Sequence, residues 1–321
     1  MVQLRSSGAK CAAIIYNPVA RGLSRRKHLL QRSTALLIQQ GIQVRLVATD
    51  GPGSASAQAR QQIDKGCDLI IAAGGDGTIN EIANGMLHSN VPLAILPGGT
   101  ANVLAREMQI PMHMERAAAQ IANLQPCRIA VGALRTNGSP PRCFLCMAGA
   151  GLDAEIVSRI NPNLKLRAGK LAYYAGGLRQ VFRPLHEFEA VIDGSRYQAS
   201  FALISRVRNY GGDLEIARGA SLLRDDFEVV LFRGTESVSY LRYLVGVAFK
   251  RITGMRGCTV LRGHSVSCQQ PGGTGTYVQV DGELAGVLPT TAEIIPDALT
   301  MLAPSSYLAR ERSHVEFAAC A

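Results

Sequence analysis

The sequence lacks the features that would place the chain across a membrane, outside the cell or on nucleic acid. It has no tryptophan among 321 residues, and no apolar run reaches the roughly eighteen residues that a membrane-spanning helix needs. Residues 1–10 have no apolar core of the kind found in a secretory signal. The basic residues form no long tract and no aromatic-rich recognition pattern accompanies them. These absences predict a cytoplasmic protein that does not bind nucleic acid.

The eight cysteines are scattered along the sequence, and their spacing matches neither a disulfide framework nor a complete zinc site. Cys143 and Cys146 form a C-x-x-C, a spacing that can hold zinc or a redox disulfide. No second Cys/His pair lies at zinc-site spacing, and the segment is typical of an apolar strand. We expect the cysteines to be buried free thiols in a reducing compartment.

The composition that is present indicates a globular protein of two domains, with 47% hydrophobic and 18% charged residues. The net charge of +10 favours an anionic partner. Each basic side chain near an anionic membrane contributes about 1 kcal/mol, so a peripheral membrane surface fits better than nucleic acid. The two densest basic clusters, which also fit an ordinary solvated surface, are Arg5, Arg21, Arg25, Arg26 and Lys27, and Lys165, Arg167 and Lys170.

The stretch 70–85 reads I-I-A-A-G-G-D-G-T-I-N-E-I-A-N-G and predicts a phosphate-binding turn. Its apolar start is typical of a strand buried on both faces, and that strand stops at Gly74. Three glycines surround Asp76, so the backbone there can take positive φ and can approach a ligand without a Cβ in the way. A helix opening at Thr78 would add unpaired amide N–H groups and a positive dipole end.

Two further turns follow apolar strands. Residues 93–96 precede P-G-G-T-A-N at 97–102, and a strand ending at Tyr16 precedes N-P-V-A-R-G at 17–22. In an open parallel sheet, the turns at the carboxyl ends of neighbouring strands meet at one crevice, where ligands bind. We therefore expect the two glycine-rich turns to face one ligand, with the N-terminal turn as a third candidate.

From residue 11 to about residue 125 the sequence alternates strands and helices. The expected strands are 12–16, 43–48, 68–73 and 92–96, and the expected helices are 25–39, 54–65, 78–86, 103–107 and 113–124. This alternation predicts an α/β domain with a parallel sheet covered on both faces.

After residue 126 the sequence changes to short β-rich runs separated by Gly, Pro and Asn. The expected strands are 128–134, 143–148, 188–192, 199–206, 228–232, 258–261, 266–269, 277–280, 292–295 and 299–302, and two stretches, 171–182 and 237–249, look helical. Many short strands with such turns predict an antiparallel, sandwich-like second domain.

These motifs, in this order, resemble the diacylglycerol kinase catalytic-domain family, which includes bacterial lipid kinases and the sphingosine and ceramide kinases. G-G-D-G-T alone is shared with NAD kinases and phosphofructokinases, whereas its extension through N-E-I-A-N-G is far more specific to the lipid kinases. The resemblance is carried by 17–22, 74–85 and 97–102, with later pieces at 149–153, 169–173, 209–212 and 281–283.

The resemblance implies a domain organisation as well as a fold. It implies an NAD kinase/phosphofructokinase-like nucleotide-binding domain at 9–126 and a β-rich domain at 127–304 that contributes the acceptor site. A C-terminal segment, 305–321, is expected to return to the first domain, with its end from His314 disordered.

The nucleotide site that the resemblance implies binds ATP together with Mg²⁺, which would bridge the phosphates and offset their charge. Asp76 is expected to position the phosphates or their metal ion. The full set of nucleotide-binding candidates is Asn17, Thr49, Gly74, Gly75, Asp76, Gly77, Thr78, Ile79, Asn80, Glu81, Gly99, Thr100 and Asn102.

Acidic residues in the second half complete the implied chemistry. Phosphoryl transfer needs a carboxylate to accept the proton of the attacking hydroxyl, and the resemblance assigns this role to Glu283, supported by Asp281. Without the other motifs, D-G-E would fit a plain hairpin turn. Asp225 and Asp226 fall where the family has an Asp-Gly that helps bind a structural metal, but this chain lacks the glycine, and the choice between them stays open.

The sequence therefore predicts an ATP- and Mg²⁺-dependent kinase that phosphorylates a lipid hydroxyl, most simply that of diacylglycerol, at a cleft between the domains. The alternatives are a kinase for NAD or another small molecule, and a non-catalytic regulator that binds nucleotide or lipid. The expected partners are the lipid substrate and an anionic membrane surface. The identity of the lipid and the oligomeric state, a homodimer included, stay open.

Overall fold

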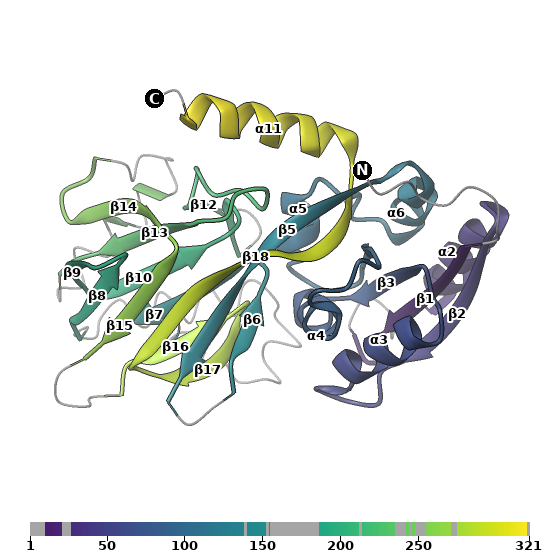
Figure 1. The fold of residues 1–321 in the computed structure, drawn as a ribbon, viewed down its shortest axis with the longest axis horizontal. Coiled ribbons are helices and arrows are strands. Elements are labelled where there is room, and N and C mark those ends of the chain that lie inside the picture. The colour runs from purple at the N-terminus through teal and green to yellow at the C-terminus, as the bar shows by residue number, and fades with distance from the viewer. Residues whose placement is uncertain are drawn as a thin grey trace. The chain divides into compact units, whose positions relative to one another are not determined.

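Figure 1 shows the computed structural model of the chain. The structure describes residues 10–20, 27–137, 140–151, 154, 186–211, 214–234, 242–243, 246–247, 254–270 and 275–319. The chain forms two compact units, unit 1 (Met1–Arg128 and Ala298–Arg310) and unit 2 (Ile129–Asp297 and Glu311–Ala321). The return of the chain to unit 1 thus begins at Ala298, earlier than the expected segment 305–321.

Unit 1 is built on a parallel sheet in the order β2-β1-β3-β4-β18. Every residue of β3 and β4 is buried, because helices cover both faces of these central strands. β2 lies at the edge and exposes 49% of Leu46. The strands are β1 (Lys10–Tyr16), β2 (Ile42–Ala48), β3 (Leu69–Gly74), β4 (Leu93–Pro97) and the end of β18 (Thr290–Ala303).

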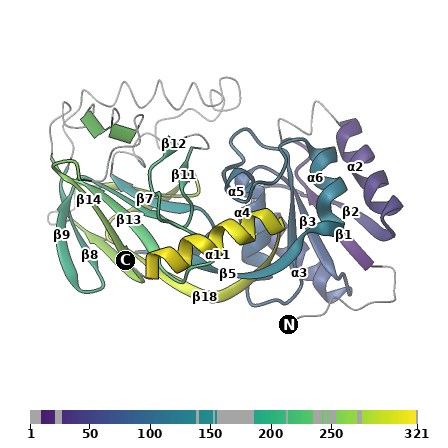
Figure 2. The same cartoon turned by 90° about the horizontal axis from the view of Figure 1, so that it is seen from above.

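The helices of unit 1 pack in pairs, α2 against α6 and α3 against α4 (Figure 2). The chain passes from β1 outward to β2 and then back past β1 to β3, so right-handed crossovers put α2 on one face and α3 and α4 on the other. The helices are α2 (Lys27–Gln39), α3 (Ser54–Asp64), α4 (Asp76–Met86), α5 (Val103–Glu107), α6 (Met114–Gln120) and the 3-10 helix η1 (Ile121–Asn123). The predicted parallel α/β domain is confirmed.

Unit 2 contains two antiparallel layers. One sheet has the order β14-β13-β10-β7-β16-β17, and the other joins the start of β18 to β15, β8 and β9, with β5 pairing with β18 and β6. The strands are β5 (Gln125–Thr136), β6 (Arg142–Phe144), β7 (Met147–Gly151), β8 (Phe188–Ile192), β9 (Ser195–Ala199), β10 (Phe201–Ser205), β13 (Phe227–Phe232), β14 (Cys258–Gly263), β15 (Ser265–Gln269), β16 (Tyr277–Val280) and β17 (Glu283–Val287). A separate pair, β11 (Asn209–Tyr210) and β12 (Leu214–Glu215), completes the unit.

The core of unit 2 lies between these two sheets. Buried side chains from both layers form one cluster, in which the rings of Phe144 and Phe227 stack at 5.6 Å. Phe188 and Val266 of the second sheet are buried in the same cluster as Ile204 of the first. The predicted sandwich-like second domain is therefore confirmed.

Several predicted elements differ from the structure. The two strands expected at 292–295 and 299–302 are one strand, β18, and the expected strand 143–148 is divided between β6 and β7. α11 (Ser305–Ala319) is helical where we expected disorder from His314 onward. The predicted helix 171–182 and most of 237–249 lie outside the described residues. Among the described helices, none is both long enough and apolar enough to cross a membrane.

Candidate functional site

The carboxyl ends of the parallel strands bring the predicted turns to one edge of the sheet in unit 1. The reversal of strand order lies between β1 and β3, which is where open α/β sheets bind ligands. Asn17 follows β1 at this point and Gly74 ends β3 there. Backbone hydrogen bonds join the neighbouring turns, from Thr49 N–H to Tyr16 O (2.9 Å), from Asn17 N–H to Ala73 O (3.3 Å) and from Gly98 N–H to Gly74 O (2.8 Å).

Gly75 and Gly99 pack directly against each other, so the two glycine-rich turns touch. A Cβ on Gly99 would lie 2.5 Å from the Cα of Gly75 and 2.8 Å from Oδ1 of Asn102. A Cβ on Gly74 would lie 2.8 Å from the Cβ of Thr78. None of the glycines in these two turns has a positive φ, so the structure does not use the conformational freedom that they allow. The glycines are needed because the two backbones and the first turn of the helix pack so closely.

α4 begins at Asp76 rather than at Thr78, with Gly75 as its N-cap residue. Gly75 provides no side-chain cap, and its carbonyl accepts the hydrogen bond of the Ile79 amide at 3.1 Å. The first-turn amides, at Asp76, Gly77 and Thr78, are therefore placed where helices bind anions. This is the part of the edge that fits a phosphate group.

The Asp76 side chain joins the two turns. Its Oδ1 accepts a hydrogen bond from the amide of Leu104, in the first turn of α5, at 3.3 Å. Burial raises the pKa of Asp76 above its ordinary value, while the amides of Leu104 and Val103 act in the opposite direction. The carboxylate of Asp76 thus caps the amino end of α5. Of the two helices that follow the glycine-rich turns, α4 is therefore the one whose amino end suits a phosphate.

Asn102 closes the second turn from within. It has φ 49° and is only 7% exposed. Its Oδ1 accepts from the amide of Gly99 at 2.9 Å, and its Nδ2 donates to the carbonyl of Gly99 at 3.1 Å. Thr100, between these residues, is exposed. The side chain of Asn102 therefore shapes the turn, and Thr100 is the most exposed residue of this turn.

The N-E-I-A-N-G extension lies along the contact between α4 and α3. Oε2 of Glu81 is 3.4 Å from the amide of Ala55, and the Ser56 hydroxyl donates to the carbonyl of Glu81 at 2.5 Å. A Cβ on Gly85 would collide with the carbonyl of Ser56. Ile79 is fully buried, and Asn80 bonds to the side chain of Asn84 at 3.1 Å. Ile79, Asn80 and Glu81 were predicted to bind nucleotide. In the structure, the contacts given above for these residues are within α4 or between α4 and α3.

Asp281 anchors a turn in unit 2 with three backbone hydrogen bonds. Its Oδ2 accepts from the amide of Leu145 at 3.0 Å, and its Oδ1 accepts from Cys146 at 3.0 Å and from Met147 at 2.9 Å. The turn needs positive φ, which is 47° at Asp281 and 81° at Gly282. Asp281 therefore fixes the turn that immediately precedes Glu283.

Glu283 is the first residue of β17, a strand that the sequence did not predict. Its side chain is 54% exposed, and its Oε2 lies 2.9 Å from Nη2 of Arg142, in β6. Nη1 of Arg142 also donates to the carbonyl of Leu284 at 3.2 Å. Sequence reasoning missed Arg142, because nothing near it in the chain signals a carboxylate that is 141 positions away.

The surroundings of Asp225 and Asp226 do not fit a metal ion. Asp225 is exposed, whereas Asp226 forms ion pairs with Arg224 at 2.7 Å and with Arg262 at 3.1 Å. Burial alone would raise the pKa of Asp226, but the hydrogen bond from Arg224 and the charge of Arg262 outweigh burial and hold it below its ordinary value. Within the described part of the chain, no three His, Cys, Asp or Glu residues are grouped to hold a metal ion.

A buried arginine supplies positive charge beside Asp226. Arg206 is fully buried, and its guanidinium group donates hydrogen bonds to four backbone carbonyls. These are Arg224 O (2.6 Å), Asp226 O (2.7 Å), Leu222 O (2.9 Å) and Ala130 O (3.1 Å). Guanidinium groups thus occupy the positions where a cation would be expected to bind carbonyl and carboxylate oxygens.

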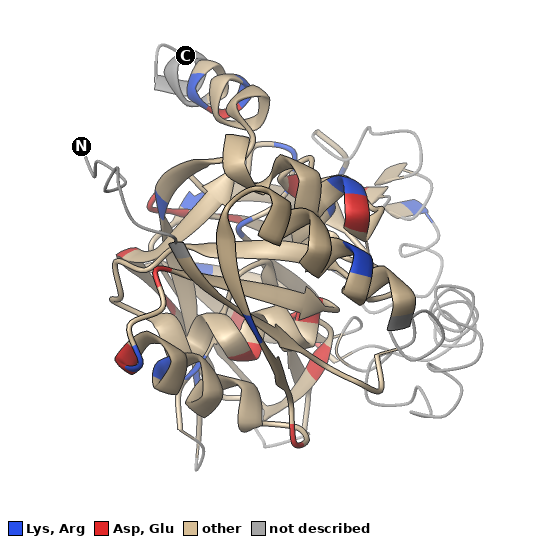
Figure 3. Cartoon of the chain, turned by 90° about the vertical axis from the view of Figure 1, so that its right-hand side faces the viewer, with Lys and Arg blue, Asp and Glu red and all other residues tan. Residues whose placement is uncertain are grey.

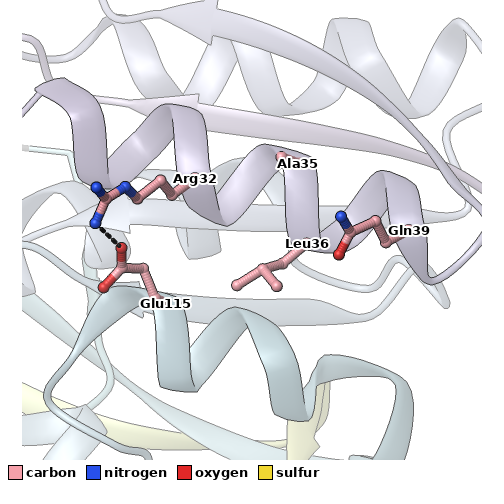
Figure 4. A pocket seen from close by; sticks show the side chains of 5 residues that line it. All are labelled: Arg32, Ala35, Leu36, Gln39 and Glu115. Carbon is pink, nitrogen blue, oxygen red and sulfur yellow. Dashed lines mark hydrogen bonds and ion pairs between the residues drawn. The ribbon is translucent and has the colours of Figure 1, made fainter.

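A shallow pocket of about 290 Å³ lies between α2 and α6 (Figure 4). An ion pair between Arg32 and Glu115, 3.4 Å long, closes one end of it. None of the predicted site residues lines this pocket. Figure 3 shows the described Lys and Arg positions dispersed over the ribbon among those of Asp and Glu. The two basic clusters and the family-like pieces at 152–153, 169–173 and 212 fall on residues whose side chains the structure does not describe.

The sequence of the chain matches two family descriptions. Residues 11–134 match "Diacylglycerol kinase catalytic domain", and residues 146–303 match "YegS C-terminal NAD kinase beta sandwich-like domain". The diacylglycerol kinase of Bacillus subtilis (strain 168) is 33% identical over 240 residues, which cover 73% of this chain and 77% of that protein. That of Staphylococcus haemolyticus (strain JCSC1435) is 28% identical over 289 residues, 87% of this chain and 84% of that protein.

The fold is also that of a solved relative. The crystal structure of a diacylglycerol kinase from Bacillus anthracis str. Sterne has a TM-score of 0.75 at 24% identity, and the match covers 94% of this chain and 99% of that chain. Both units of the chain thus have counterparts among these proteins. The chain belongs to the diacylglycerol kinase catalytic-domain family.

Proposed function

We propose that this chain is an ATP- and Mg²⁺-dependent lipid kinase that transfers the γ-phosphate to a lipid hydroxyl. The observation that carries the proposal is the placement of Asn17 and the Gly74–Gly75 turn at the reversal of strand order in unit 1. Diacylglycerol is the first acceptor to test, because the relatives from Bacillus subtilis and Staphylococcus haemolyticus are named diacylglycerol kinases.

In this proposal the phosphates of ATP bind at the amino end of α4. The amides of Asp76, Gly77 and Thr78 would donate hydrogen bonds to phosphate oxygens, as helix N-termini do in other phosphate sites. Asn17, Thr49 and the exposed Thr100 would complete the polar edge. Mg²⁺ would offset the phosphate charge, and it commonly binds through one or two carboxylates and the phosphates themselves. Asp76 is the carboxylate within the turn that could contribute to it.

Glu283 would act as the general base of the reaction. Its exposed carboxylate can accept the proton of the lipid hydroxyl as that oxygen attacks phosphorus. Asp281 would hold the turn through its three amide contacts. Arg142 would orient the carboxylate, because it binds both Glu283 and the next carbonyl in the chain.

The decisive experiment offers the purified chain γ-labelled ATP and Mg²⁺ with diacylglycerol, a total lipid extract or NAD. We expect labelled lipid from the native chain and a loss of about 10²–10⁴-fold in rate for Glu283→Gln. Glu293→Gln is the matched control, since Glu293 is also an exposed carboxylate in an ion pair with an arginine, at 3.4 Å. Labelled NAD in place of lipid would refute the lipid acceptor, and nucleotide binding without any labelled product would refute catalysis.

We also propose that the chain meets its substrate at an anionic membrane surface, to which the net charge of +10 is attracted. Sedimentation with vesicles that contain an anionic phospholipid should show binding that weakens as salt rises, because exposed charges are screened over about 10 Å at 0.1 M salt. An affinity for the vesicles that does not change with salt concentration would count against an electrostatic attachment. Vesicles of neutral phospholipid provide the control.

A further inference from the structure

Two cysteines far apart in the sequence meet at the amino-terminal edge of the sheet in unit 1. The Sγ atoms of Cys11 and Cys67 are 3.5 Å apart. Cys11 lies near the start of β1, and Cys67 lies just before β3. The two segments are held together there, because the Asp68 amide donates to the Cys11 carbonyl at 2.8 Å and the Cys11 amide donates to Oδ2 of Asp68 at 3.2 Å.

The two thiols differ in their access to solvent. Cys67 is 3% exposed, whereas Cys11 is half-buried. Burial and the neighbouring thiol raise the pKa of Cys67 to about 11, so it is protonated at neutral pH. Nη1 of Arg45 lies 3.9 Å from the Sγ of Cys67 and provides positive charge beside the pair. A small oxidant from solvent would therefore meet Cys11 first.

We propose that Cys11 and Cys67 form an oxidisable dithiol, a modification site at which hydrogen peroxide converts the two thiols to a disulfide. The fold places the pair suitably, since the backbone hydrogen bonds between Cys11 and Asp68 hold the two segments side by side and the Sγ atoms already lie 3.5 Å apart. The sulfurs need to approach by only about 1.5 Å to reach the S–S bond length.

The reaction balances in two steps. The Cys11 thiolate attacks one oxygen of hydrogen peroxide and the O–O bond breaks, which yields a sulfenic acid and, with one proton, water. The Sγ of Cys67 then attacks the Sγ of Cys11, the S–O bond breaks, and the hydroxyl leaves as a second water with the proton of the Cys67 thiol. Two thiols and one peroxide thus give one disulfide and two waters, and a dithiol reductant reverses the change.

The disulfide would tie two segments 56 positions apart. Such a link restricts the unfolded chain and so raises thermal stability. It lies at the edge of the sheet opposite the glycine turns, because those turns follow the carboxyl ends of the same parallel strands. The expected effect is therefore on the unfolding midpoint.

The test treats the reduced full chain with one equivalent of hydrogen peroxide, blocks the remaining thiols and identifies the peptides by mass spectrometry. We expect a cross-linked pair of peptides containing Cys11 and Cys67, lighter by two hydrogen atoms, with a Tm several degrees higher that dithiothreitol reverses. Cys258→Ser should behave as the native chain, whereas Cys11→Ser and Cys67→Ser should form no such link. Oxidation of Cys11 to sulfinic or sulfonic acid without the link would overturn the proposal.

A second measurement keeps the proposal testable if either serine variant fails to fold. Phenylarsine oxide bridges two adjacent thiols, so the native chain should bind one equivalent and lose reactivity at both Cys11 and Cys67. Independent labelling of the two cysteines in its presence would show that they are not adjacent. Both readouts are covalent and do not depend on the proposed kinase activity, so the two proposals can fail separately.

Discussion

Glu283 and Arg142 form an ion pair 2.9 Å long in unit 2, between the first residue of β17 and the first residue of β6. The same guanidinium group binds the carbonyl of Leu284, so it contacts two successive residues of β17. Both side chains are partly exposed, with 39% of Arg142 and 54% of Glu283 accessible. The pair is therefore better suited to aiming a carboxylate than to stabilising the fold, since exposed ion pairs contribute little to stability.

Removal of Arg142 should reduce turnover without affecting ATP binding. We expect Arg142→Met to lower kcat as much as about a hundredfold, the effect of misplacing a reacting group by about 1 Å. Arg142→Lys should recover only part of the rate, because an ammonium group lacks the fork that binds both Glu283 and Leu284 O. Steady-state kinetics with lipid and ATP provide the measurement.

Arg135→Met is the matched control for that variant, since Arg135 pairs with Glu293 at 3.4 Å in the same unit. Its kinetics should remain those of the native chain. A native kcat in Arg142→Met would mean that the ion pair has no part in catalysis.

Asp281→Asn should lower both stability and activity. The carboxylate accepts three amide hydrogen bonds, and an amide side chain has only one acceptor oxygen to offer them. Charged hydrogen bonds contribute about 1.5–3 kcal/mol each, so we expect the free energy of unfolding to fall by about 2–3 kcal/mol. Activity should fall because the turn before Glu283 loosens. Urea unfolding and lipid kinase assays on the same preparations test both effects.

Asp193→Asn is a control that separates the loss of stability expected for Asp281→Asn from its loss of activity. Asp193 also has positive φ, 45°, and also accepts backbone hydrogen bonds, from His264 at 3.0 Å and from Ser265 at 2.9 Å. Its variant should lose stability while retaining kinase activity per folded molecule. If both variants retain activity equally, Asp281 is only structural.

Gly99→Ala should weaken ATP binding. The added methyl group would lie 2.5 Å from the Cα of Gly75, so the two turns must move apart. Overpacking of this kind costs about 1–3 kcal/mol. Gly66→Asn is the control, because Gly66 has φ 80° with open space around it and asparagine tolerates that conformation. Titration with a fluorescent ATP analogue measures the affinity, and unchanged affinity in Gly99→Ala would place the nucleotide elsewhere.

Asp226 should stabilise the fold at neutral pH and lose this effect in acid. Its folded pKa lies below its ordinary value of 3.8, so the folded state favours the ionised carboxylate. The stabilisation is therefore fully present above that value and disappears as pH falls through the folded pKa. We expect Asp226→Asn to be about 1–3 kcal/mol less stable than the native chain at pH 7. The difference should narrow below about pH 4, and unfolding curves across this range test it.

Two controls show whether a metal ion contributes at this position. Asp225→Asn should leave stability unchanged, because Asp225 is exposed. Treatment with EDTA should leave the unfolding midpoint unchanged, because Arg224 and Arg262 already pair with Asp226. A midpoint that falls with EDTA and recovers with Mg²⁺ would restore the structural metal that the family resemblance implied.

The sequence predicted what depends on local pattern. The apolar runs ending at Tyr16, Gly74 and Pro97 identified the central strands, since strands buried on both faces must be apolar throughout. The change to short β runs after Pro126 likewise predicted the sandwich. β17 was not predicted, because Glu283 and Gly286 interrupt its apolar pattern and its pairing with β16 is irregular at Val278 and Gln279.

The sequence did not show why particular residue types are needed at the candidate site. The glycines allow positive φ, but the structure requires them because Gly75 and Gly99 touch. That contact exists only once β3 and β4 are side by side. Asp76 suggested a phosphate or metal ligand, but its hydrogen bond with the amide of Leu104, 28 positions away, had no signal in the sequence. Long-range contacts of this kind carry no local signature.

β18 has a consequence for how the chain is made. Its first part pairs with β15 of unit 2, and Met301 near its end pairs with Leu93 of unit 1. The chain must therefore be made as far as residue 303 before either unit has this strand. Until then the sheets of both units are incomplete, although most of their strands have already been made. A gene cut near residue 128 should yield a first half with an open edge at β4, a surface prone to aggregation.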